Sequence, residues 1–323
     1  MLLILKVKRM VILLLIILIT FLVVFLGYTY YKLNSMYIPD DKLINKQDLS
    51  KKDNKSIINV LLIGVDNYKL DKGSRSDCMM IMTIDNKNKN IKLTSLARDT
   101  YVYIKGYDRE KLTHAYAYGG SELLLQTIKD NFQIDIDNYV TFNFASFEKI
   151  IDILGGVEVN VLENDIDMLN KYIEVGYGLR NDQYKKDTEL DIVEHSGIQT
   201  LNGYQALAFS RIRYQDSAYK RDARQREVVK ACIKKLNDIT KNKYINILDT
   251  MSEDIKTNIK VSQMLNLGEN ILDIGISNLI SLEFPINKKE ELLDKKGWVI
   301  TWEKGDIDIL KDFIFENKIQ SDS

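Results

Sequence analysis

An unbroken apolar stretch near the N-terminus constrains this chain more than any other feature of its sequence. The stretch runs from Met10 to Gly27, includes Thr20 as its one hydroxyl side chain, and follows three basic residues within positions 6–9. Eighteen residues of helix span about 27 Å, which is close to the ~30 Å hydrocarbon core of a bilayer. Basic residues before the stretch and tyrosines after it predict one transmembrane helix, with a cytoplasmic N-terminus and an extracellular remainder.

A cleaved signal peptide is the alternative interpretation of this stretch. A signal peptide has a shorter apolar region of ~7–15 residues that ends in small residues, whereas the sequence LGYTYYKLNS has no A-x-A site. We therefore expect a cytoplasmic N-terminus at 1–9, an anchor at 10–27, a polar extracytoplasmic stalk at 28–56 and one folded domain at 57–323.

The folded domain has an acidic balance of charge. Residues 57–323 contain 36 Lys and Arg against 42 Asp and Glu. Binding of nucleic acid relies on an extended basic surface, so we expect no nucleic-acid partner. The arginines within 211–226 stand out from this background and predict a discrete anion-binding pocket.

Strand and helix signals alternate along the folded domain. Residues 57–66 are apolar and β-branched and predict a buried central strand, and 77–104 predict two strands around a polar turn. Two helical pieces are expected to meet at Gly119 and Gly120, and the polar segment 163–198 predicts a surface insertion. The alternation predicts an α/β (α+β) domain, with a central mixed β-sheet and helices on both of its faces.

Several common sites find no support in the sequence. His114 and His195 have no histidine partner at i+3 or i+4, which argues against a zinc site and a Ser-His triad. The sequence contains no P-loop and no dinucleotide-binding motif. A disulfide between Cys78 and Cys232 stays open, but we interpret both as small buried apolar side chains.

Two aspartates fall at predicted strand ends. Asp66 ends the first strand, and Asp77 follows it within the sequence GSRSD. Two carboxylates with open coordination positions suit Mg²⁺, which takes its remaining ligands from water and substrate phosphate. An aspartate at a strand end is more often a turn former, so the spacing alone leaves both interpretations open.

The segment SRIRYQDSAYKRDARQREVV holds the densest group of cationic side chains. Its candidate anion ligands share one face of a predicted helix or alternate just before it: Arg211, Arg213, Arg221, Arg224 and Gln225. A planar guanidinium matches the oxygens of a phosphate, and we expect these residues at the surface of a cleft. A solvated basic helix with internal ion pairs, such as Asp222 with Arg226, is the alternative.

Seven motifs resemble, in order and approximate spacing, those of the LytR-CpsA-Psr family. They are NVLLIGVD, RSDCMMIMTID, SLARDT, KLTHAYAYGG, NYVTFNFASFEKIIDILGGVEVNV, LNGYQALAFSRIRY and RDARQREVV, and they lie within roughly residues 57–235. The resemblance implies a catalytic domain at 57–323 on the outer surface of the cell membrane. It also implies a phosphotransferase that moves a glycopolymer, such as teichoic acid or capsule, from an undecaprenyl-diphosphate carrier in the membrane lipid onto peptidoglycan.

The resemblance also implies site residues. The metal ligands fall on Asp66 and Asp77, with Mg²⁺ or Mn²⁺ as the cofactor. The diphosphate-binding residues fall on Arg75, Arg98, Arg211, Arg213, Arg221, Arg224 and Gln225. Arg98 and the other arginines would stabilise charge on the departing lipid phosphate. Either Asp66 or Asp99 would take the proton of the attacking sugar hydroxyl.

Some positions depart from the usual motifs of the family. Asn67 stands where an arginine is common, Ala97 replaces a proline and Cys78 replaces a threonine. Only the change at Asn67 removes a charged ligand. The lipid tail requires an apolar groove, which the helical faces at 122–128 and 147–154 could line, although both also fit an ordinary core.

Three other functions remain open from the sequence: a hydrolase of the lipid diphosphate, a non-catalytic sensor of lipid-linked intermediates, and a regulator of the transcriptional attenuator type. The acidic external domain argues against DNA contact. A sensor that only binds lipid-linked intermediates would need most of the residues that a transferase needs.

Overall fold

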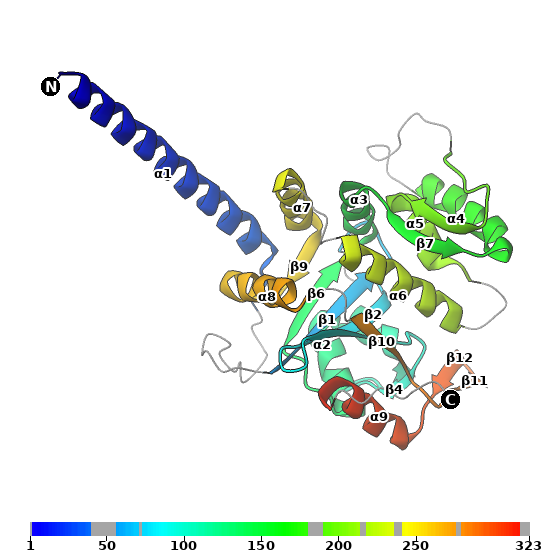
Figure 1. Ribbon diagram of the computed structural model, residues 1–323. Coiled ribbons are helices and arrows are strands. Elements are labelled where there is room, and N and C mark those ends of the chain that lie inside the picture. The colour runs from blue at the N-terminus through cyan, green and yellow to red at the C-terminus, as the bar shows by residue number, and fades with distance from the viewer. Residues whose placement is uncertain are drawn as a thin grey trace.

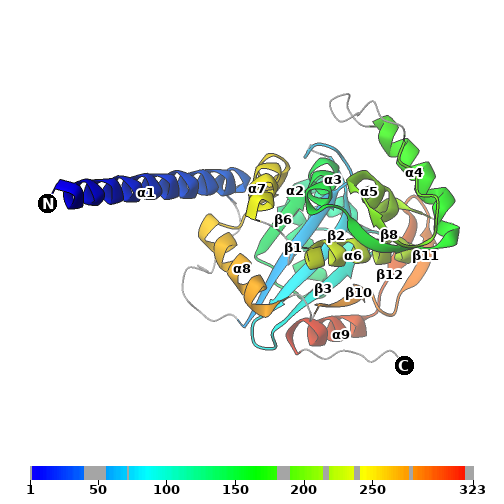
Figure 2. The ribbon, with the colours of Figure 1, turned by 45° about the horizontal axis from the view of Figure 1, so that its top comes forward.

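A mixed β-sheet forms the centre of the molecule (Figures 1 and 2). The computed structural model describes residues 2–39, 56–70, 73–179, 190–213, 218–235, 241–275 and 279–316. In this part of the chain the central sheet has the order β10-β3-β2-β1-β6-β9. Its strands are β1 (Ile57–Val65), β2 (Ser76–Asp85), β3 (Asn90–Leu96), β6 (Asn138–Phe142), β9 (Ile255–Thr257) and β10 (Leu279–Phe284). Strand β1 pairs antiparallel with β2 and parallel with β6, which confirms the predicted mixed sheet.

Helices cover both faces of this sheet, as the sequence predicted. The helices of the described residues are α1 (Leu2–Met36), α2 (Leu112–Phe132), α3 (Phe144–Leu154), α4 (Ile166–Leu179), α5 (Gly203–Arg211), α6 (Ala218–Lys235), α7 (Lys241–Asp254), α8 (Val261–Ile274) and α9 (Lys304–Phe315). Helices α2 and α9 pack on one face, whereas α6 and α8 contact the other. The remaining elements are a 3-10 turn, η1 (Glu163–Asp165), and the hairpins β4 (Tyr101–Tyr103) with β5 (Arg109–Lys111), β7 (Val157–Val161) with β8 (Gly197–Leu201), and β11 (Lys289–Leu293) with β12 (Gly297–Thr301).

The central position of β1 explains its apolar sequence. Leu61 and Ile63 pack toward α2 and are fully buried, while Val60 is 1% exposed on the opposite face. Each such side chain contributes roughly 1.5–3 kcal/mol through burial. Burial on both faces fixes the strand in place and carries Asp66 to the edge of the sheet at a defined position.

Helix α2 consists of two pieces, as the sequence predicted. Gly119 and Gly120 have non-helical backbone angles, and φ of Gly120 is +64°. A Cβ on Gly119 would lie 2.6 Å from Cβ of Leu123. Glycine is therefore required at this break, which sets the first piece (residues 112–118) at its own angle beside the end of β3.

The segment 163–198 differs from its prediction as a polar insertion. Helix α4 occupies much of it, and Leu169 and Ile173 are buried in a second core with α5, α6 and the β7–β8 hairpin. These apolar residues are four positions apart, and the polar residues between them concealed the helical pattern. Residues 180–189 of this segment lie outside the described residues.

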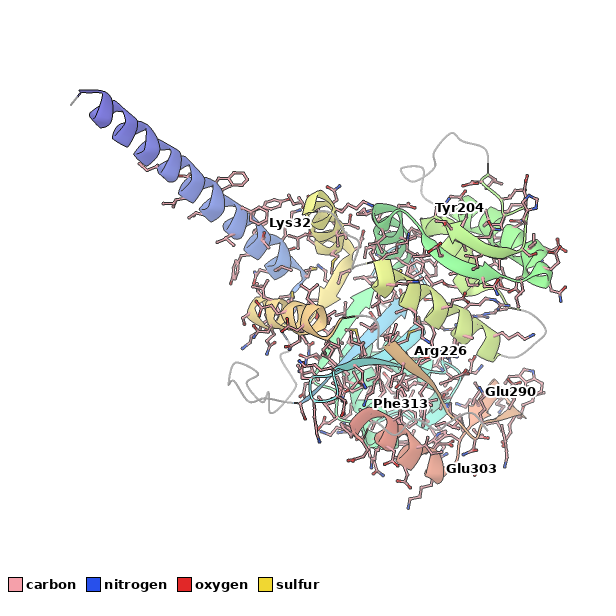
Figure 3. All side chains as sticks on the ribbon, viewed as in Figure 1. Lys32, Tyr204, Arg226, Glu290, Glu303 and Phe313 are labelled. Atoms are coloured by element: carbon pink, nitrogen blue, oxygen red, sulfur yellow. The ribbon has the colours of Figure 1, made fainter. Side chains whose placement is uncertain are left out.

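Helix α1 continues through the first part of the predicted stalk. Met36 is 2% exposed at its end, and Lys32 points toward α7, where Nζ lies 2.9 Å from Asp249 (Figure 3). Residues 40–55 lie outside the described residues, as do many side chains of the predicted anchor at 10–27, so the anchor stays a prediction. Among the helices of the described residues, none combines the length and apolarity that a membrane crossing requires.

Candidate functional site

A pocket of about 350 Å³ opens where β1 ends and β2 begins. Eight of the ten side chains that the sequence predicted as site residues line it: Asp66, Arg75, Asp77, Arg98, Arg211, Arg213, Arg221 and Gln225. They come from the loop between β1 and β2, from β2 and α6, and from the chain after β3 and at the end of α5. The fold thus brings a largely cationic set of side chains to one edge of the sheet.

A β-bulge places the two aspartates at this edge. The register of β1 against β2 shifts between Gly64, which pairs with Cys78, and Val65, which pairs with Ser76. Asp77 is therefore the extra residue of the bulge and is free of a register partner, which turns its side chain toward the pocket. Beyond Val65, the backbone N–H of Asp66 donates to the carbonyl of Arg75 at 3.0 Å.

The loop after β1 is closed by the side chain of Asp66. Its Oδ1 accepts a hydrogen bond from the backbone N–H of Arg75 at 2.7 Å. Asn67 makes a local turn, because its Oδ1 accepts from the backbone N–H of Tyr68 at 2.7 Å, and it does not line the pocket. The residue that departs from the family motif at this position therefore contributes no side chain to the pocket lining.

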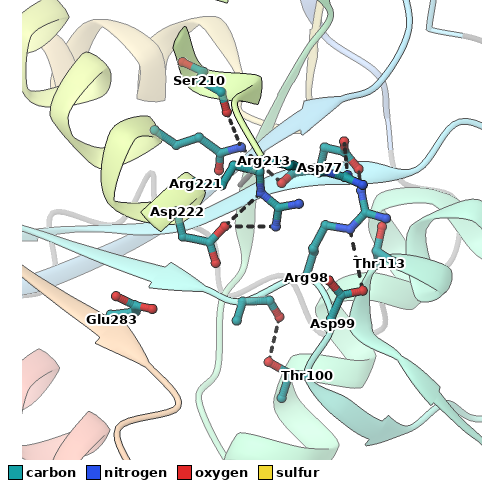
Figure 4. Close-up of polar contacts among 12 residues, drawn as sticks. Asp77, Arg98, Asp99, Thr100, Thr113, Ser210, Arg213, Arg221, Asp222 and Glu283 are labelled. Atoms are coloured by element: carbon teal, nitrogen blue, oxygen red, sulfur yellow. Dashed lines mark hydrogen bonds and ion pairs between the residues drawn. The ribbon is translucent and has the colours of Figure 1, made fainter. Parts of the chain in front are cut away.

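Asp77 is the acidic centre of the arginine cluster (Figure 4). Its Oδ1 is hydrogen-bonded to Nη1 of Arg98, and its Oδ2 lies 3.8 Å from Nη2 of Arg213. The pKa of Arg213 is lowered, first by burial and then by the positive charges of Arg221 and Arg98. Like charges held this close repel one another, and a bound anion would relieve that repulsion.

The end of α5 explains why Arg211 and Arg213 both face the pocket. Asn202 caps the start of this helix, where its Oδ1 accepts from the backbone N–H of Gln205 at 3.0 Å. At the other end, Ile212 leaves the helical conformation and is fully buried. The alternation therefore places Ile212 in the core and its two arginine neighbours in the pocket lining.

Arg221 is held by the residue that follows it. Its Nε and Nη2 donate to Oδ1 of Asp222 at 3.2 Å and 3.0 Å (Figure 4). Arg221 is 4% exposed and Asp222 is 3% exposed. The prediction that Arg221 is a surface residue of a cleft was therefore wrong, because it reaches the pocket from a buried ion pair.

The carboxyl of Asp222 is the member of this pair that titrates. Burial opposes the charge of Arg221, but the attraction of Asp222 prevails and the pKa of Arg221 is raised, so the guanidinium stays charged. Burial raises the pKa of Asp222 to about 6, although Arg221 opposes the shift. Oδ2 of Asp222 has no hydrogen-bond partner among the described residues, which makes the charged form of this buried carboxyl less favourable and is consistent with its raised pKa.

We expect Asp222 to make the stability of the protein depend on pH. The folded state binds the Asp222 proton more tightly than the unfolded state, whose pKa is near 3.8. The stabilisation is complete below pH ~4 and is lost as the pH rises through about 6. Between these values the free energy of unfolding should fall by up to ~3 kcal/mol relative to Asp222→Asn. Urea unfolding of both proteins at pH 4, 5, 6 and 7 measures the difference, and parallel pH profiles would contradict it.

Two predicted site residues do not line the pocket. Arg224 is 7% exposed, and its Nε and Nη2 bind the carboxylate of Asp165 in η1 at 3.1 Å and 2.7 Å. This pair holds Arg224 away from the pocket lining, so its role as a diphosphate ligand stays a prediction. Asp99 lies beside the cluster, where Oδ1 is 3.1 Å from Nζ of Lys111 and 3.8 Å from Nε of Arg98.

The ion pair that served as the example for a basic helix with internal pairs, Asp222 with Arg226, was also wrong. Arg226 does not form its ion pair with Asp222 but with Glu283 of β10, whose Oε2 lies 3.0 Å from Nη2. Asp222 and Arg226 are four positions apart and share one helical face. Asp222 is instead buried against Arg221, to which it is hydrogen-bonded, and so it is not available to Arg226.

An aromatic wall borders the cationic side of the pocket, and the sequence predicted only the part of it that includes Phe147. Arg211 lies over the rings of Phe144 and Tyr172, with 4.9 Å and 5.9 Å from its Cζ to the ring centroids. Phe147, from the predicted apolar face at 147–154, also lines the pocket. Of the other predicted face, at 122–128, Leu124, Leu125 and Ile128 belong to the core. The only available signal was the spacing of Phe142, Phe144 and Phe147 around a strand end.

The two cysteines are partly buried, whereas the sequence predicted fully buried side chains. Both are free thiols, so the open possibility of a disulfide is excluded. Burial raises the pKa of Cys78 and of Cys232 to about 12. Cys78 lines the pocket as a neutral thiol and supplies no nucleophile at neutral pH.

The two pocket aspartates fit a Mg²⁺ ion that is otherwise bound by water and phosphate. Both line the same pocket and offer carboxylate oxygens, the ligands that this ion prefers. No group of three or more His, Cys, Asp and Glu side chains gathers to hold a metal in the described residues, so water and phosphate would have to supply the other ligands at this pair. A bound cation would compete with Arg98 for Asp77, so part of their contact would have to loosen.

Sequence comparison finds a match to the model of the LytR_cpsA_psr family over residues 23–310. The chain is similar to the polyisoprenyl-teichoic acid–peptidoglycan teichoic acid transferase TagT of Bacillus subtilis (strain 168), with 36% identity over 218 residues. That alignment covers 66% of this chain and 63% of TagT, slightly less than two thirds of the relative. It is also similar to the transferase TagU of Enterococcus faecalis, with 33% identity over 236 residues, which cover 69% of this chain and 70% of TagU.

Solved structures give the same result. A structure described as TagT bound to LI-WTA aligns with a TM-score of 0.66 and 27% identity, over 88% of this chain and 96% of that one. A structure of the LytR-CPS2A-psr family protein YwtF (TagT) with bound octaprenyl pyrophosphate lipid aligns with a TM-score of 0.62 and 25% identity, over the same shares of the two chains.

Proposed function

Because this chain belongs to the LytR_cpsA_psr family, we propose that it transfers a teichoic-acid-type glycopolymer from a polyprenyl diphosphate carrier onto peptidoglycan. Relatives with 33–36% identity carry the name of this activity, and a related structure holds a polyprenyl pyrophosphate lipid. Undecaprenyl diphosphate is the carrier we propose, since the reaction requires a lipid that presents its diphosphate at the membrane surface.

The convergence of five arginines on one pocket is the observation that carries this proposal. They are Arg75, Arg98, Arg211, Arg213 and Arg221. A diphosphate diester carries about two negative charges, and guanidinium groups bind phosphate oxygens through paired hydrogen bonds. The aromatic wall of Phe144 and Tyr172 gives the first lipid units an apolar surface next to that charge.

The proposed reaction is a displacement at phosphorus. A sugar hydroxyl of peptidoglycan attacks the phosphorus that carries the glycopolymer, and the bond from this phosphorus to the oxygen of the lipid phosphate breaks. The arginines stabilise the charge that develops on the departing lipid phosphate. Asp66 receives the hydroxyl proton in this scheme, because Asp99 lies outside the pocket lining and is paired with Lys111. Mg²⁺ or Mn²⁺ held by Asp66 and Asp77 would neutralise part of the diphosphate charge.

A transfer assay tests this function directly. The full-length protein is incubated with a polyprenyl diphosphate-linked glycan, a soluble peptidoglycan oligomer and Mg²⁺, and the products are analysed by mass spectrometry. A glycan-peptidoglycan phosphodiester together with polyprenyl monophosphate is the expected result. Release of the glycan phosphate without coupling would identify a hydrolase instead, and an unchanged donor would identify a binding protein.

We also propose that the domain lies outside the cell, anchored by residues 10–27. The apolar stretch and the basic residues before it support this topology. Protease added to intact protoplasts is expected to digest residues 57–323, whereas a cytoplasmic control protein should stay intact. Protection of this region until the membrane is permeabilised would contradict the proposed localisation.

A further inference from the structure

Two tyrosine rings form an exposed stack close to the pocket. Tyr107 and Tyr118 are 46% and 41% exposed, although aromatic side chains of this size usually bury most of their surface. Their ring centroids are 4.2 Å apart, and the ring planes differ by 16°. The tilted ring of His114 continues this surface, with its centroid 5.7 Å from that of Tyr118.

The surrounding contacts hold the stack in a fixed place. Tyr107 lies in the turn between β4 and β5, where its backbone N–H donates to the carbonyl of Ile104 at 2.9 Å. Tyr118 ends the first piece of α2, immediately before the break at Gly119. Nδ1 of His114 lies 3.2 Å from Glu110, and Glu110 is in turn bound by Lys296. Side chains that are already held in place lose little further conformational entropy when a partner binds.

The first piece of α2 connects this surface to the pocket. At its start, the hydroxyl of Thr113 donates to the carbonyl of Ser76 at 2.9 Å, and its backbone N–H donates to the carbonyl of Arg98 at 3.0 Å. Just after it, Oγ of Ser121 lies 3.2 Å from Thr141 on β6, the strand next to β1. Five residues separate Thr113 from Tyr118, or about 7.5 Å along a helix. The stack therefore lies about one and a half turns of α2 beyond the contacts that join Thr113 to Ser76 and Arg98, next to the pocket-lining residues Asp77 and Arg98.

The chemistry of the surface favours a saccharide over a lipid. A pyranose has one face of C–H groups, which packs flat on an aromatic ring, and a rim of hydroxyls, which need hydrogen-bond partners. Tyr107 and Tyr118 supply flat rings with polar tips, while Glu110 and His114 supply charged or polar partners beside them. An anionic lipid surface would instead attract a border of basic side chains, whereas the carboxylate of Glu110 contacts His114 at the edge of this stack.

We propose that Tyr107 and Tyr118 form the acceptor subsite, on which a sugar ring of the peptidoglycan glycan strand stacks while a neighbouring hydroxyl enters the pocket. This inference rests on the proposed transfer to peptidoglycan, since that reaction requires a second glycan at the pocket. The subsite gives the acceptor a fixed position relative to the arginine-bound diphosphate. It also separates acceptor binding from donor binding, so the two can be tested independently.

Binding of a soluble peptidoglycan tetrasaccharide to the full-length protein in detergent tests the subsite without any transfer step. Tyr107→Ala and Tyr118→Ala are each expected to weaken binding by about three- to tenfold, and the double variant by more. Tyr118→Phe keeps the ring and loses only the polar tip, so it is expected to weaken binding less than Tyr118→Ala. Tyr103→Ala is the matched control, because Tyr103 is 50% exposed in the same hairpin and is not part of the stack.

Steady-state transfer gives a second readout. The alanine variants at the stack should raise KM for the peptidoglycan acceptor and leave KM for the lipid-linked donor unchanged. Equal tetrasaccharide affinity of the wild type and both alanine variants would overturn the subsite, and so would an equal loss in Tyr103→Ala. If the tetrasaccharide binds as expected while no transfer occurs, the subsite stands and the proposed reaction fails.

Discussion

Asp77→Asn is expected to lower the rate of glycopolymer transfer by about 10²–10³-fold. Asp77 contacts Arg98 directly and lies 3.8 Å from Arg213, and it shares the pocket with Asp66. The substitution removes a proposed metal ligand and also releases two guanidinium groups from the positions in which they would meet the diphosphate. Asp66→Asn is expected to cause a loss of similar size through the metal ligand and the proton acceptor.

The losses of transfer rate caused by Asp66→Asn and Asp77→Asn should not combine fully in the double variant. Groups that act as one unit fail together, so Asp66→Asn/Asp77→Asn should lose little more activity than the worse single variant. EDTA should inactivate the wild type, and added Mg²⁺ or Mn²⁺ should restore transfer. Initial rates with a defined lipid-linked donor measure both effects. Full activity in EDTA, or strictly multiplicative losses in the double variant, would show that these aspartates do not share a metal ion.

Thermal unfolding in EDTA is the control that shows whether Asp66→Asn and Asp77→Asn still fold. Asp66 is exposed, so Asp66→Asn should leave the melting temperature nearly unchanged. Asp77→Asn should lower it slightly, because Arg98 and Arg213 then repel each other without the carboxylate between them. A large loss of stability in either variant would assign the loss of transfer to unfolding and not to the site.

Local patterns were enough to predict the main elements of the fold. The apolar run of β1, the paired glycines within α2 and the alternation of Arg211 and Arg213 each produced the expected structure, because each depends on neighbouring residues. Helix α4 was missed because its buried residues pack on elements distant in the sequence, and only that packing separates them from a polar loop. The extension of α1 to Met36 was missed for the same reason, since α7 and β9 supply its contacts.

The site was predictable in its composition and not in its geometry. Arg221, Arg224 and Gln225 share a helical face within about 100°, which is why the sequence grouped them. The structure divides that face: Arg221 and Gln225 line the pocket, whereas Arg224 turns to Asp165, fifty-nine positions earlier in the chain. Helical spacing gives the direction of a side chain relative to its neighbours, but it contains no information on which element lies opposite.

Arg221→Ala is expected to affect both stability and binding, whereas Arg213→Ala should affect binding alone. The side chain of Arg213 is 54% exposed, so its removal leaves the free energy of unfolding nearly unchanged. Its loss should weaken binding of a short-chain prenyl diphosphate by ~1.5–3 kcal/mol, as for one charge-assisted hydrogen bond. Arg221→Ala should weaken binding by at least as much and should also leave Asp222 buried without its partner.

The stranded carboxyl of Asp222 distinguishes the two roles of Arg221. At pH 7, breaking this buried pair should cost ~3–5 kcal/mol of stability. At pH 5 the cost should be smaller, because burial raises the pKa of Asp222 to about 6 and a neutral carboxyl is then the main form. Arg221→Ala/Asp222→Asn should therefore regain most of the lost stability at pH 7 but none of the lost affinity. Four proteins are compared: the wild type, Arg213→Ala, Arg221→Ala and Arg221→Ala/Asp222→Asn. Urea unfolding measures their stability, and calorimetric titration measures their affinity for the prenyl diphosphate. Recovery of diphosphate affinity in the double variant would show that Arg221 only supports the fold, and equal stability of the two arginine variants at pH 7 would show that its pair with Asp222 carries no weight.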